Sequence, residues 1–434
     1  MTDRAVKNFE KEENNLNSKE LLNFFLEWRN SDEIIIDNSI RKEIRKFNKK
    51  ILNIDAIFHK TCLYETMHNV DTQIIQPLGV NEHGIKHILK VAEMAQLMLL
   101  ATLREKDLQD LDQVVKKLIR VYIGGLTHDI GYESSFLNYL IENNYIEMPA
   151  SVKQEGALGI YKHAKQEFEK DRKKYISMIL KSGESPKDAL SSHAWMGGKI
   201  VQDFLEDILN PNKSLYKKFI NKKYRKYDFF DEKSYRKSLH IIANMVNNHD
   251  TPDGKNKDDV EKFIGNLVNE NKSVICGLWG DKIDIGGRAP KGYLADNLID
   301  LKSKDAIHKR ITTAVQEEIV RIYPKEQKII LSLDVNLKKV EDFVRNAFMK
   351  QKGESIDFTY DERQFQNDFS EGFDKRYSFL SRSVSRLFAP SDKPSEFSLE
   401  FMYPKSSFSY NVTQIRIADA LVKGASQYSL EKYN

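Results

Sequence analysis

Histidine and aspartate side chains recur along the chain at positions where they could bind metal ions. The stretch GGLTHDIGY (residues 124–132) places His128 and Asp129 at the end of an apolar segment, with glycines on either side. Either the pair caps a helix end, or it holds a metal. Metal binding requires further ligands elsewhere in the sequence, so the other histidines and acids decide between the two interpretations.

Two more histidines stand four residues apart in the segment NEHGIKHILKVAEM (residues 81–94). Apolar residues recur here at helical spacing, and side chains four residues apart lie on one face of a helix. A lone helical histidine is most often a core or surface residue. Because His83 and His87 are one turn apart, the pair weakens this structural interpretation but does not remove it.

Three further segments place polar side chains at the ends of predicted helices. SSHAWMGG puts His193 at a helix start, behind two serines that could cap it. HIIANMVNNHD brings His249 to the end of another helix. SVICGLWGDKIDIGG carries Asp281 and Asp284 in an apolar context, where a carboxylate is costly to bury unless it is ionically paired or metal-bound.

The chemistry of this set points to particular metals. Imidazole nitrogens with bridging carboxylate oxygens suit borderline divalent metals such as Mn, Fe, Ni or Zn. Because no cysteine belongs to the set, its composition argues against a structural zinc site. Each element is a weak signal alone, whereas the ordered set of histidines and aspartates at predicted helix ends is a stronger one.

This ordered set resembles the signature of the HD-domain metal-dependent phosphohydrolases, and most nearly the HD-GYP cyclic-dinucleotide phosphodiesterases. The resemblance covers roughly residues 80–295 and implies an all-helical domain that holds two divalent ions, Mn, Fe, Ni or Mg. His83 stands where some members carry an acidic ligand of a third ion; it either ligates or only hydrogen-bonds around the site. The implied ligands are His87, His128, Asp129 (bridging two ions), His193, His249 and Asp281.

The motifs match in part. His87 precedes Val91-Ala92 by the spacing of the family, His193 is followed by Gly197, and HDTPDG (residues 249–254) is similar to the family's HExxDG.

In place of the GYP triplet the chain has KNK (residues 255–257). Three single-residue features also differ from the family pattern: Tyr132 replaces the lysine of HDIGK, Asn248 replaces the first of two histidines, and Asp250 replaces Glu. These departures bear on cyclic di-GMP specificity more than on metal binding.

A basic turn follows the last ligand in the sequence. RAPKGY supplies Arg288 and Lys291, which resemble the family's phosphate-holding Arg-x-Pro-Lys segment. Arg offers a forked donor for phosphate oxygens and Lys a compact charge. The alternative is a solvated basic turn.

The resemblance implies hydrolysis of a phosphoester by a metal-activated water, on a phosphorylated small molecule, a nucleotide or a cyclic (di)nucleotide. The catalytic residues would be Asp129, Arg288 and Lys291, and the last two would also bind substrate. Two other functions remain open: a non-catalytic nucleotide-binding sensor module, and an HD-fold di-iron oxygenase.

The elements that must position these residues are mainly helical. Residues 1–18 read as a flexible tail and residues 19–300 as a helical domain, with motifs over 83–291 and insertions near 164–188 and 213–237. After about residue 324 the pattern changes, and residues 301–434 are expected to form a small α+β region of unknown role. Its expected strands are KIILSLDV (328–335) and EFSLEFMY (396–403), and its expected helices cover 337–350 and roughly 362–388.

Composition bounds the class of protein. The 434 residues are 40% hydrophobic and 30% charged, with no apolar run long enough to cross a membrane and no signal-peptide pattern. Two cysteines, Cys62 and Cys276, cannot form a disulfide framework, so we expect a cytoplasmic protein without a membrane partner. The net charge of +4 is too small to argue for nucleic acid.

Residues 213–237 interleave basic and aromatic side chains, as in either a nucleic-acid-facing patch or a solvated helix with buried aromatics.

The basic turn gives a test of substrate class. We expect Arg288→Ala to weaken binding and turnover of phosphate substrates by roughly 1.5–3 kcal/mol, the size of a lost charge-assisted hydrogen bond. Metal content should not change, because protonated Arg and Lys cannot ligate. Steady-state kinetics and metal analysis of Arg288→Ala and Lys291→Ala measure both quantities. Normal turnover by both variants would show that the turn is a solvated loop.

Overall fold

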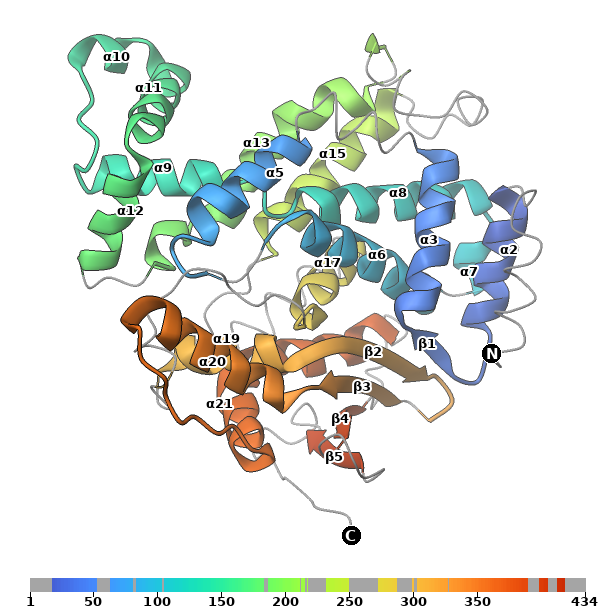
Figure 1. Ribbon diagram of the computed structural model, residues 1–434. Helices are drawn as coiled ribbons and strands as arrows, with labels where there is room; N and C mark the ends of the chain where they lie inside the picture. Colours follow the sequence, from blue (N-terminus) through green and yellow to red (C-terminus); the bar gives the residue numbers. More distant parts are fainter. Residues whose placement is uncertain are drawn as a thin grey trace.

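The computed structural model describes most of the helical and strand-forming parts of the chain. The described residues are 18–52, 63–80, 83–103, 105–182, 186–210, 212–214, 217, 232–249, 272–286, 299, 303–326, 328–388, 398–404 and 412–417. The fold is mainly α, with a small α+β region towards the C-terminus, as the sequence predicts (Figure 1). Among the described helices, none has the length and apolar character needed to cross a membrane.

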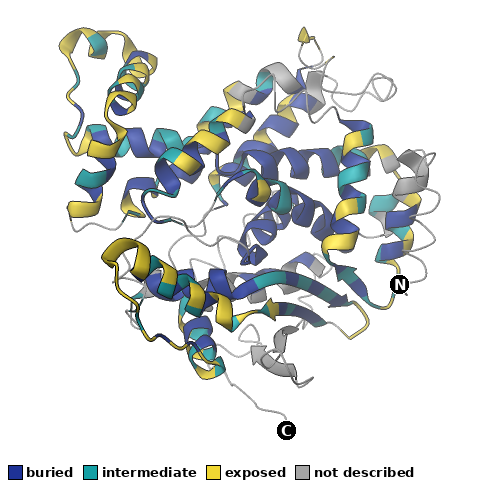
Figure 2. Cartoon of the chain, in the orientation of Figure 1, coloured by how far each residue is buried: buried dark blue, intermediate teal, exposed yellow. Residues whose placement is uncertain are grey.

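One helix lies at the centre of the helical part. α6 (Ile85–Thr102) is buried along nearly its whole length, and α8 (Leu111–Thr127) and α17 (Lys272–Ile283) pack against it. α13 (His193–Leu209) packs on α15 (Glu232–Asn247), which in turn contacts α8. Figure 2 shows α6, α8 and α17 as largely buried, whereas α10 (Ala150–Gln154) and much of α11 (Gly156–Lys170) are exposed.

The remaining described helices surround this centre. They are α2 (Ser18–Arg29), α3 (Asn38–Ile51), α5 (Leu63–Val70), the π-helical turn η1 (Asp71–Ile75), α7 (Glu105–Leu108), α9 (Tyr132–Glu142), α12 (Arg172–Lys181) and the 3₁₀ turn η2 (Asp188–Leu190). Local sequence explains several boundaries, since Asp37 and Asp110 cap the N-termini of α3 and α8 with their carboxylates.

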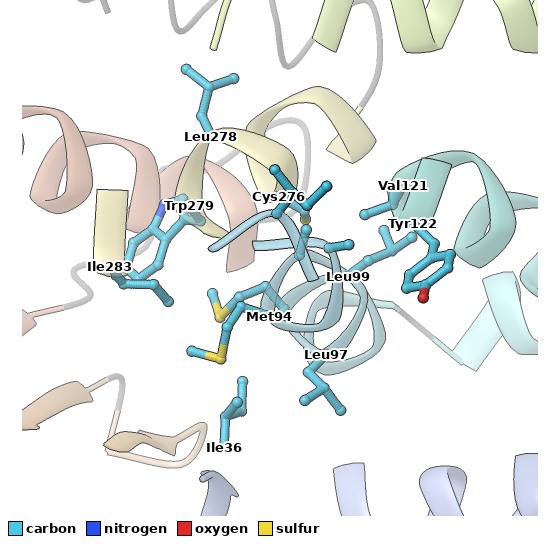
Figure 3. Close-up of a cluster of buried hydrophobic side chains, with 14 of the residues drawn as sticks. Ile36, Met94, Leu97, Leu99, Val121, Tyr122, Cys276, Leu278, Trp279 and Ile283 are labelled. Atoms are coloured by element: carbon cyan, nitrogen blue, oxygen red, sulfur yellow. The ribbon is translucent and has the colours of Figure 1, made fainter. Parts of the chain in front are cut away.

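The main hydrophobic core gathers around α6. Figure 3 shows Met94 and Leu97 of α6 among side chains from α8, α17 and the short strand β1 (Ile34–Ile36). Trp279 of α17 and Tyr122 of α8 are among its largest fully buried members. The cluster continues without interruption into the C-terminal helices and strands. Residues on either side of position 300 therefore share one core.

A five-stranded mixed sheet forms the β part of the C-terminal region. Its order is β1-β2-β3-β4-β5, with β2 (Val315–Tyr323), β3 (Lys328–Val335), β4 (Ser398–Pro404) and β5 (Val412–Ile417). Neighbouring strands are antiparallel except β3 and β4, which are parallel. A parallel pair needs a long crossover connection, and the helices α20 (Leu337–Lys352) and α21 (Glu362–Phe388) lie in that connection.

Strands β1, β2 and β5 are not among the strands that the sequence predicts. The expected strands at 328–335 and 396–403 correspond to β3 and β4. However, the change of pattern placed after residue 324 comes earlier, because β2 begins at Val315. β1 lies in a segment expected to be helical, and it pairs with β2 in the register Ile34 to Ile322. Three residues are too short to show an alternating pattern, so only the tertiary pairing defines this strand.

The described residues of the insertion at 164–188 lie largely in α11 and α12, which share a second hydrophobic core with α5, η1 and α9. Phe168 of α11 and Tyr175 and Ile179 of α12 are buried against Phe136 of α9. The expected flexible tail lies almost entirely outside the described residues. So does most of the 213–237 segment, where α15 begins at Glu232.

A buried ion pair joins two helices of the C-terminal region. Arg310 on α19 (Lys304–Ala314) is fully buried and forms a two-pronged contact with Asp368 on α21, with N–O distances of 2.7 and 3.0 Å. Tyr360 donates its hydroxyl to the same carboxylate at 2.7 Å. Removing one partner of such a pair leaves an uncompensated charge in the interior.

We therefore expect Asp368→Asn to lower the free energy of unfolding by about 3–5 kcal/mol, measured by urea denaturation. The matched control is Asp32→Asn, which breaks the pair between Asp32 and Lys325, both largely exposed. Water already solvates both of these charges, so the control should unfold at the wild-type urea concentration. Equal losses in the two variants would contradict a special role for the buried pair.

Candidate metal centre

Helix ends converge to bring the sequence-predicted ligands together. His87 lies in the first turn of α6, and His128 follows the last residue of α8 with Asp129 next to it. His193 is the first residue of α13. His249 stands just beyond α15, and Asp281 lies in the last turn of α17. All six side chains are buried.

Glycines allow the elements that carry these ligands to approach closely. A Cβ atom on Gly125 of α8 would lie 2.4 Å from the Cα atom of Ala92 on α6. A Cβ atom on Gly131, in the turn after Asp129, would lie 1.9 Å from the carbonyl oxygen of His193. Both positions therefore require glycine for steric reasons, and the glycines flanking the His-Asp pair set how closely its neighbours pack.

Each of the four buried imidazoles has its Nδ1 atom bound to an acceptor. His128, His193 and His249 donate from Nδ1 to backbone carbonyls at 2.7, 2.8 and 2.6 Å. His87 Nδ1 lies 2.5 Å from the carboxylate of Asp284. Because a carbonyl oxygen can only accept, Nδ1 carries the proton in the three carbonyl-bound rings, and neutral imidazole then presents a lone pair at Nε2.

These Nε2 atoms face one another in pairs. The Nε2 atoms of His193 and His249 are 2.8 Å apart, and those of His87 and His128 are 3.1 Å apart. Two neutral rings would bring two lone pairs together at these distances, which is unfavourable unless a proton or a cation lies between them. Two nitrogens bound to one ion at about 2.0–2.1 Å in a roughly right-angled arrangement have this separation.

The Asp129 carboxylate lies between the two histidine pairs. Its Oδ2 atom is 3.3 Å from His87 Nε2 and 3.1 Å from His128 Nε2. Its Oδ1 atom is 3.4 Å from His249 Nε2 and 3.9 Å from His193 Nε2. The Oδ2 atom is buried and has no hydrogen-bond partner among the described residues. The carboxylate is thus oriented as a ligand that could serve both histidine pairs.

The two aspartates at the end of α17 have different surroundings. Asp281 Oδ1 lies 3.6 Å from His87 Nε2 and 3.8 Å from His128 Nε2, so Asp281 joins that histidine pair. Its other oxygen is 2.9 Å from the ammonium of Lys282. Asp284 instead contacts the opposite nitrogen of His87, Nδ1, at 2.5 Å. The sequence indicates both acids as costly to bury, and the resemblance implies only Asp281 as a ligand.

The charges in this cluster stabilise one another. Burial opposes the charged form of every group here. The His128 imidazole nevertheless holds the pKa of the Asp129 carboxyl well below its usual range, and Asp129 in turn raises the pKa of His128. Lys282 and the nearby imidazoles lower the pKa of Asp281 in the same way. Both carboxylates are therefore ionised in the interior, where they attract positive charge.

His83 lies near the centre but not in the predicted position. It was expected inside the helix with His87, whereas α6 begins at Ile85 and His83 precedes it. Its backbone N–H donates to Asp71 at 2.8 Å, and this contact holds the segment before α6. Its ring lies 5.3 Å from the His87 ring, and its side chain forms a possible ligand group with His87 and Asp129.

Tyr132 is a neighbour whose contact the sequence did not indicate. Its ring stacks on His193 with the centroids 4.0 Å apart and the planes 3° from parallel, and it meets the His83 ring edge-on. A buried aromatic ring in van der Waals contact fixes the plane of the His193 imidazole. The sequence showed only that a tyrosine replaces the family's lysine here.

Other predictions for this region differ from the structure or lie beyond it. The two serines before His193 do not cap α13: Ser192 hydrogen-bonds Ser135, and Ser191 donates to the carbonyl of Asp188. The seryl hydroxyls instead connect the start of α13 to α9 and η2. Arg288, Lys291 and Asp250 lie outside the described residues.

The buried histidine and aspartate groups could hold a metal ion. Within the described chain the groups that come close enough are His83–His87–Asp129, His87–His128–Asp281 and Asp129–His193–His249. The donor set combines imidazole nitrogen and carboxylate oxygen without thiolate, which suits a borderline divalent cation. The imidazole orientations fixed at Nδ1 and the buried Oδ2 atom of Asp129 both fit the binding of such a cation.

Metal binding should stabilise the folded protein, because a cation that binds only the folded state adds about 2.7 kcal/mol at 100 times its Kd. We expect a chelator to lower the melting temperature of the wild-type protein. Asp129→Asn and His128→Ala should remove this chelator dependence and lower the metal content, with helical content retained in circular dichroism. His240→Ala, an exposed histidine on α15, is the control and should behave as wild type. A wild-type melting temperature that is insensitive to chelator would contradict the centre.

Comparisons with known proteins give no independent identification. No family model, no curated protein and no solved structure matches the chain. The resemblance to HD-domain phosphohydrolases therefore rests on the ordered ligands themselves, and the function of the centre has to be argued from its geometry.

Proposed function

We propose that this protein is a metal-dependent phosphohydrolase of the HD-domain type, with a divalent cation on each side of Asp129. One cation would be held by His87, His128 and Asp281, and the other by His193 and His249. His83 is the candidate ligand of a third. The imidazole and carboxylate donors, together with the resemblance, are compatible with Mn, Fe, Ni or Mg.

The observation that carries the proposal is the orientation of the Asp129 carboxylate. Its two oxygens face two different histidine pairs, at 3.1–3.4 Å from the nearest Nε2 atoms. If Asp129 served only the His87–His128 pair, which also has Asp281, the His193–His249 pair would be left without an anionic partner among the described residues. A bridging carboxylate between two such pairs is typical of dinuclear hydrolytic sites, in which the paired ions stabilise the attacking and leaving oxygens.

When bound, two such cations lower the pKa of a water molecule towards neutrality and polarise a phosphoryl oxygen. The residues of the chain would supply orientation and charge. Asp129 would connect the two histidine pairs, and Tyr132 stacks on the His193 ring and fixes its plane. Lys282 neutralises the outer oxygen of Asp281 and so limits the negative charge of the ligand set.

The substrate class rests on the sequence. A nucleotide or cyclic (di)nucleotide needs cationic groups beyond the ligands to hold its phosphates, and Arg288 and Lys291 follow the last ligand closely in the chain. Because the GYP triplet and the HDIGK lysine are replaced, the proposal does not specify cyclic di-GMP. A phosphoester of a nucleotide or a phosphorylated small molecule is the class we propose.

We expect the metal-stripped protein to hydrolyse phosphoesters only after it is reloaded with a divalent cation. The test is a screen of phosphomonoesters, nucleotides and cyclic (di)nucleotides with Mn, Fe, Ni and Mg in turn, scored by chromatography of the products. Asp129→Asn should lower turnover at least about 100-fold, because an amide cannot neutralise the two ions. Asp203→Asn, an exposed acid on α13, is the matched control and should leave turnover unchanged.

Three outcomes of this screen would argue against the proposal. Full activity in Asp129→Asn would exclude the bridging role. Tight nucleotide binding without any product would favour a sensor module, and iron-dependent oxygen uptake without phosphoester hydrolysis would favour an oxygenase. Parallel measurement of nucleotide binding and oxygen consumption on the same metal-loaded samples separates these cases.

A further inference from the structure

A line of buried charged groups runs from the metal centre to the C-terminal sheet. Asp284 contacts His87 Nδ1 through Oδ2 at 2.5 Å and the ammonium of Lys90 through Oδ1 at 2.6 Å. The same ammonium lies 2.5 Å from Oε2 of Glu318 on strand β2. Lys90 and Glu318 are 228 residues apart in sequence. The line thus links the proposed ligand His87 to strand β2 of the C-terminal region.

The groups in this line are withdrawn from water. Asp284 and Glu318 are almost fully buried, and only 16% of the Lys90 side chain is exposed. Charges in such surroundings are costly unless each is paired, and here one ammonium serves two carboxylates. Removing Lys90 would leave both carboxylates without their cation, and removing either carboxylate would leave the ammonium with only one anionic partner, so the charges of the three groups depend on one another.

Glu318 has a second set of contacts. Its Oε1 atom accepts the backbone N–H of Ile285 at 2.5 Å and also that of Gly286. These residues directly follow Asp284 at the end of α17, the helix that carries the proposed ligand Asp281. The Glu318 carboxylate therefore binds both the Lys90 ammonium and the backbone N–H groups that follow α17.

A β-bulge turns Glu318 towards the helical part. The pairing of β2 with β3 shifts in register between Val315 and Glu317. Without this shift, strict alternation from the buried Val315 would bring Glu317 inwards and turn Glu318 outwards. With it, Glu318 lies on the buried face together with Val320 and Ile322. Bulges commonly re-aim a side chain next to a functional site.

We propose that Glu318 is a positioning residue of the metal centre. It acts through Lys90 and Asp284 to fix the ring of His87, and through the backbone after Asp284 to fix the end of α17. A carboxylate on the outer nitrogen of a metal-binding histidine orients the ring and raises its basicity. The C-terminal α+β region thereby raises metal affinity without supplying a ligand. The inference rests on the metal binding that the proposed function requires and not on hydrolysis.

The test is metal affinity in Glu318→Gln, measured with Co²⁺ or Mn²⁺ by competition against a chromophoric chelator. Gln keeps an oxygen that can accept the two backbone N–H groups, so the substitution removes only the charge that faces Lys90. Loss of an outer partner commonly costs 10–100-fold in metal affinity, and we expect about a tenfold rise in Kd. The visible spectrum of the Co²⁺ form should change as well, because the His87 ring is less constrained.

A double-mutant cycle distinguishes positioning from general stabilisation. Asp284→Asn alone should weaken metal binding about 10–100-fold. If Glu318 acts through Asp284, Glu318→Gln should have little further effect on Kd in the Asp284→Asn background, since coupled residues are not additive. Independent effects of the two substitutions on Kd would overturn the proposed line of action.

Two control variants complete the experiment. Glu317→Gln changes the half-buried neighbour on the same strand, and Asp368→Asn breaks the buried ion pair between α19 and α21. Both should keep the wild-type Kd and Co²⁺ spectrum, although Asp368→Asn lowers stability. An unchanged Kd in Glu318→Gln, with wild-type metal binding intact, would overturn this inference alone. A wild-type protein that binds neither metal would overturn the centre and the inference together.

Discussion

The helical part of this protein is organised around two buried carboxylates. Asp129 and Asp281 are ionised in an interior where an unpaired charge costs several kcal/mol. Positive charge can come from a protonated imidazole or from a cation. The backbone carbonyls that accept from the Nδ1 atoms of His128, His193 and His249 turn the Nε2 atoms of these rings inwards. Each Nε2 atom can then carry a proton or bind a cation. The close helix contacts at glycine positions allow the Nε2 atoms of His193 and His249, and those of His87 and His128, to lie 2.8 and 3.1 Å apart.

Support for the centre comes in layers from different parts of the chain. The inner layer consists of residues at the ends of five helices, and the next consists of carbonyls from α8, η2 and α15, together with Tyr132 and Asp284. Only the layer beyond that, Lys90 and Glu318, reaches the sheet. Short local contacts therefore fix the orientation of three of the rings. His87 instead depends on a side chain whose own position is set by contacts from distant sequence.

The sequence anticipated what depends on local pattern. Strand β3, helix α21 and the placing of His128, His193 and His249 at helix ends all follow from periodicity and from polar residues that end apolar runs. Strand β1 and the contact between Lys90 and Glu318 do not, because each is defined by pairing between residues more than 200 positions apart. The stacking of Tyr132 on His193 was missed because neither residue type predicts its partner.

Strand β1 has a consequence for how the chain is made. Glu33, beside β1, contacts Arg321 and is 288 residues away from it in sequence. At the usual rates of synthesis, roughly 15–60 s separate the emergence of the two segments from the ribosome. Ile34–Ile36 must wait through this interval with their backbone unpaired, and an apolar edge of this kind readily pairs with other chains. Correct folding of this protein in the cell thus depends on keeping three isoleucines shielded until strand β2 emerges.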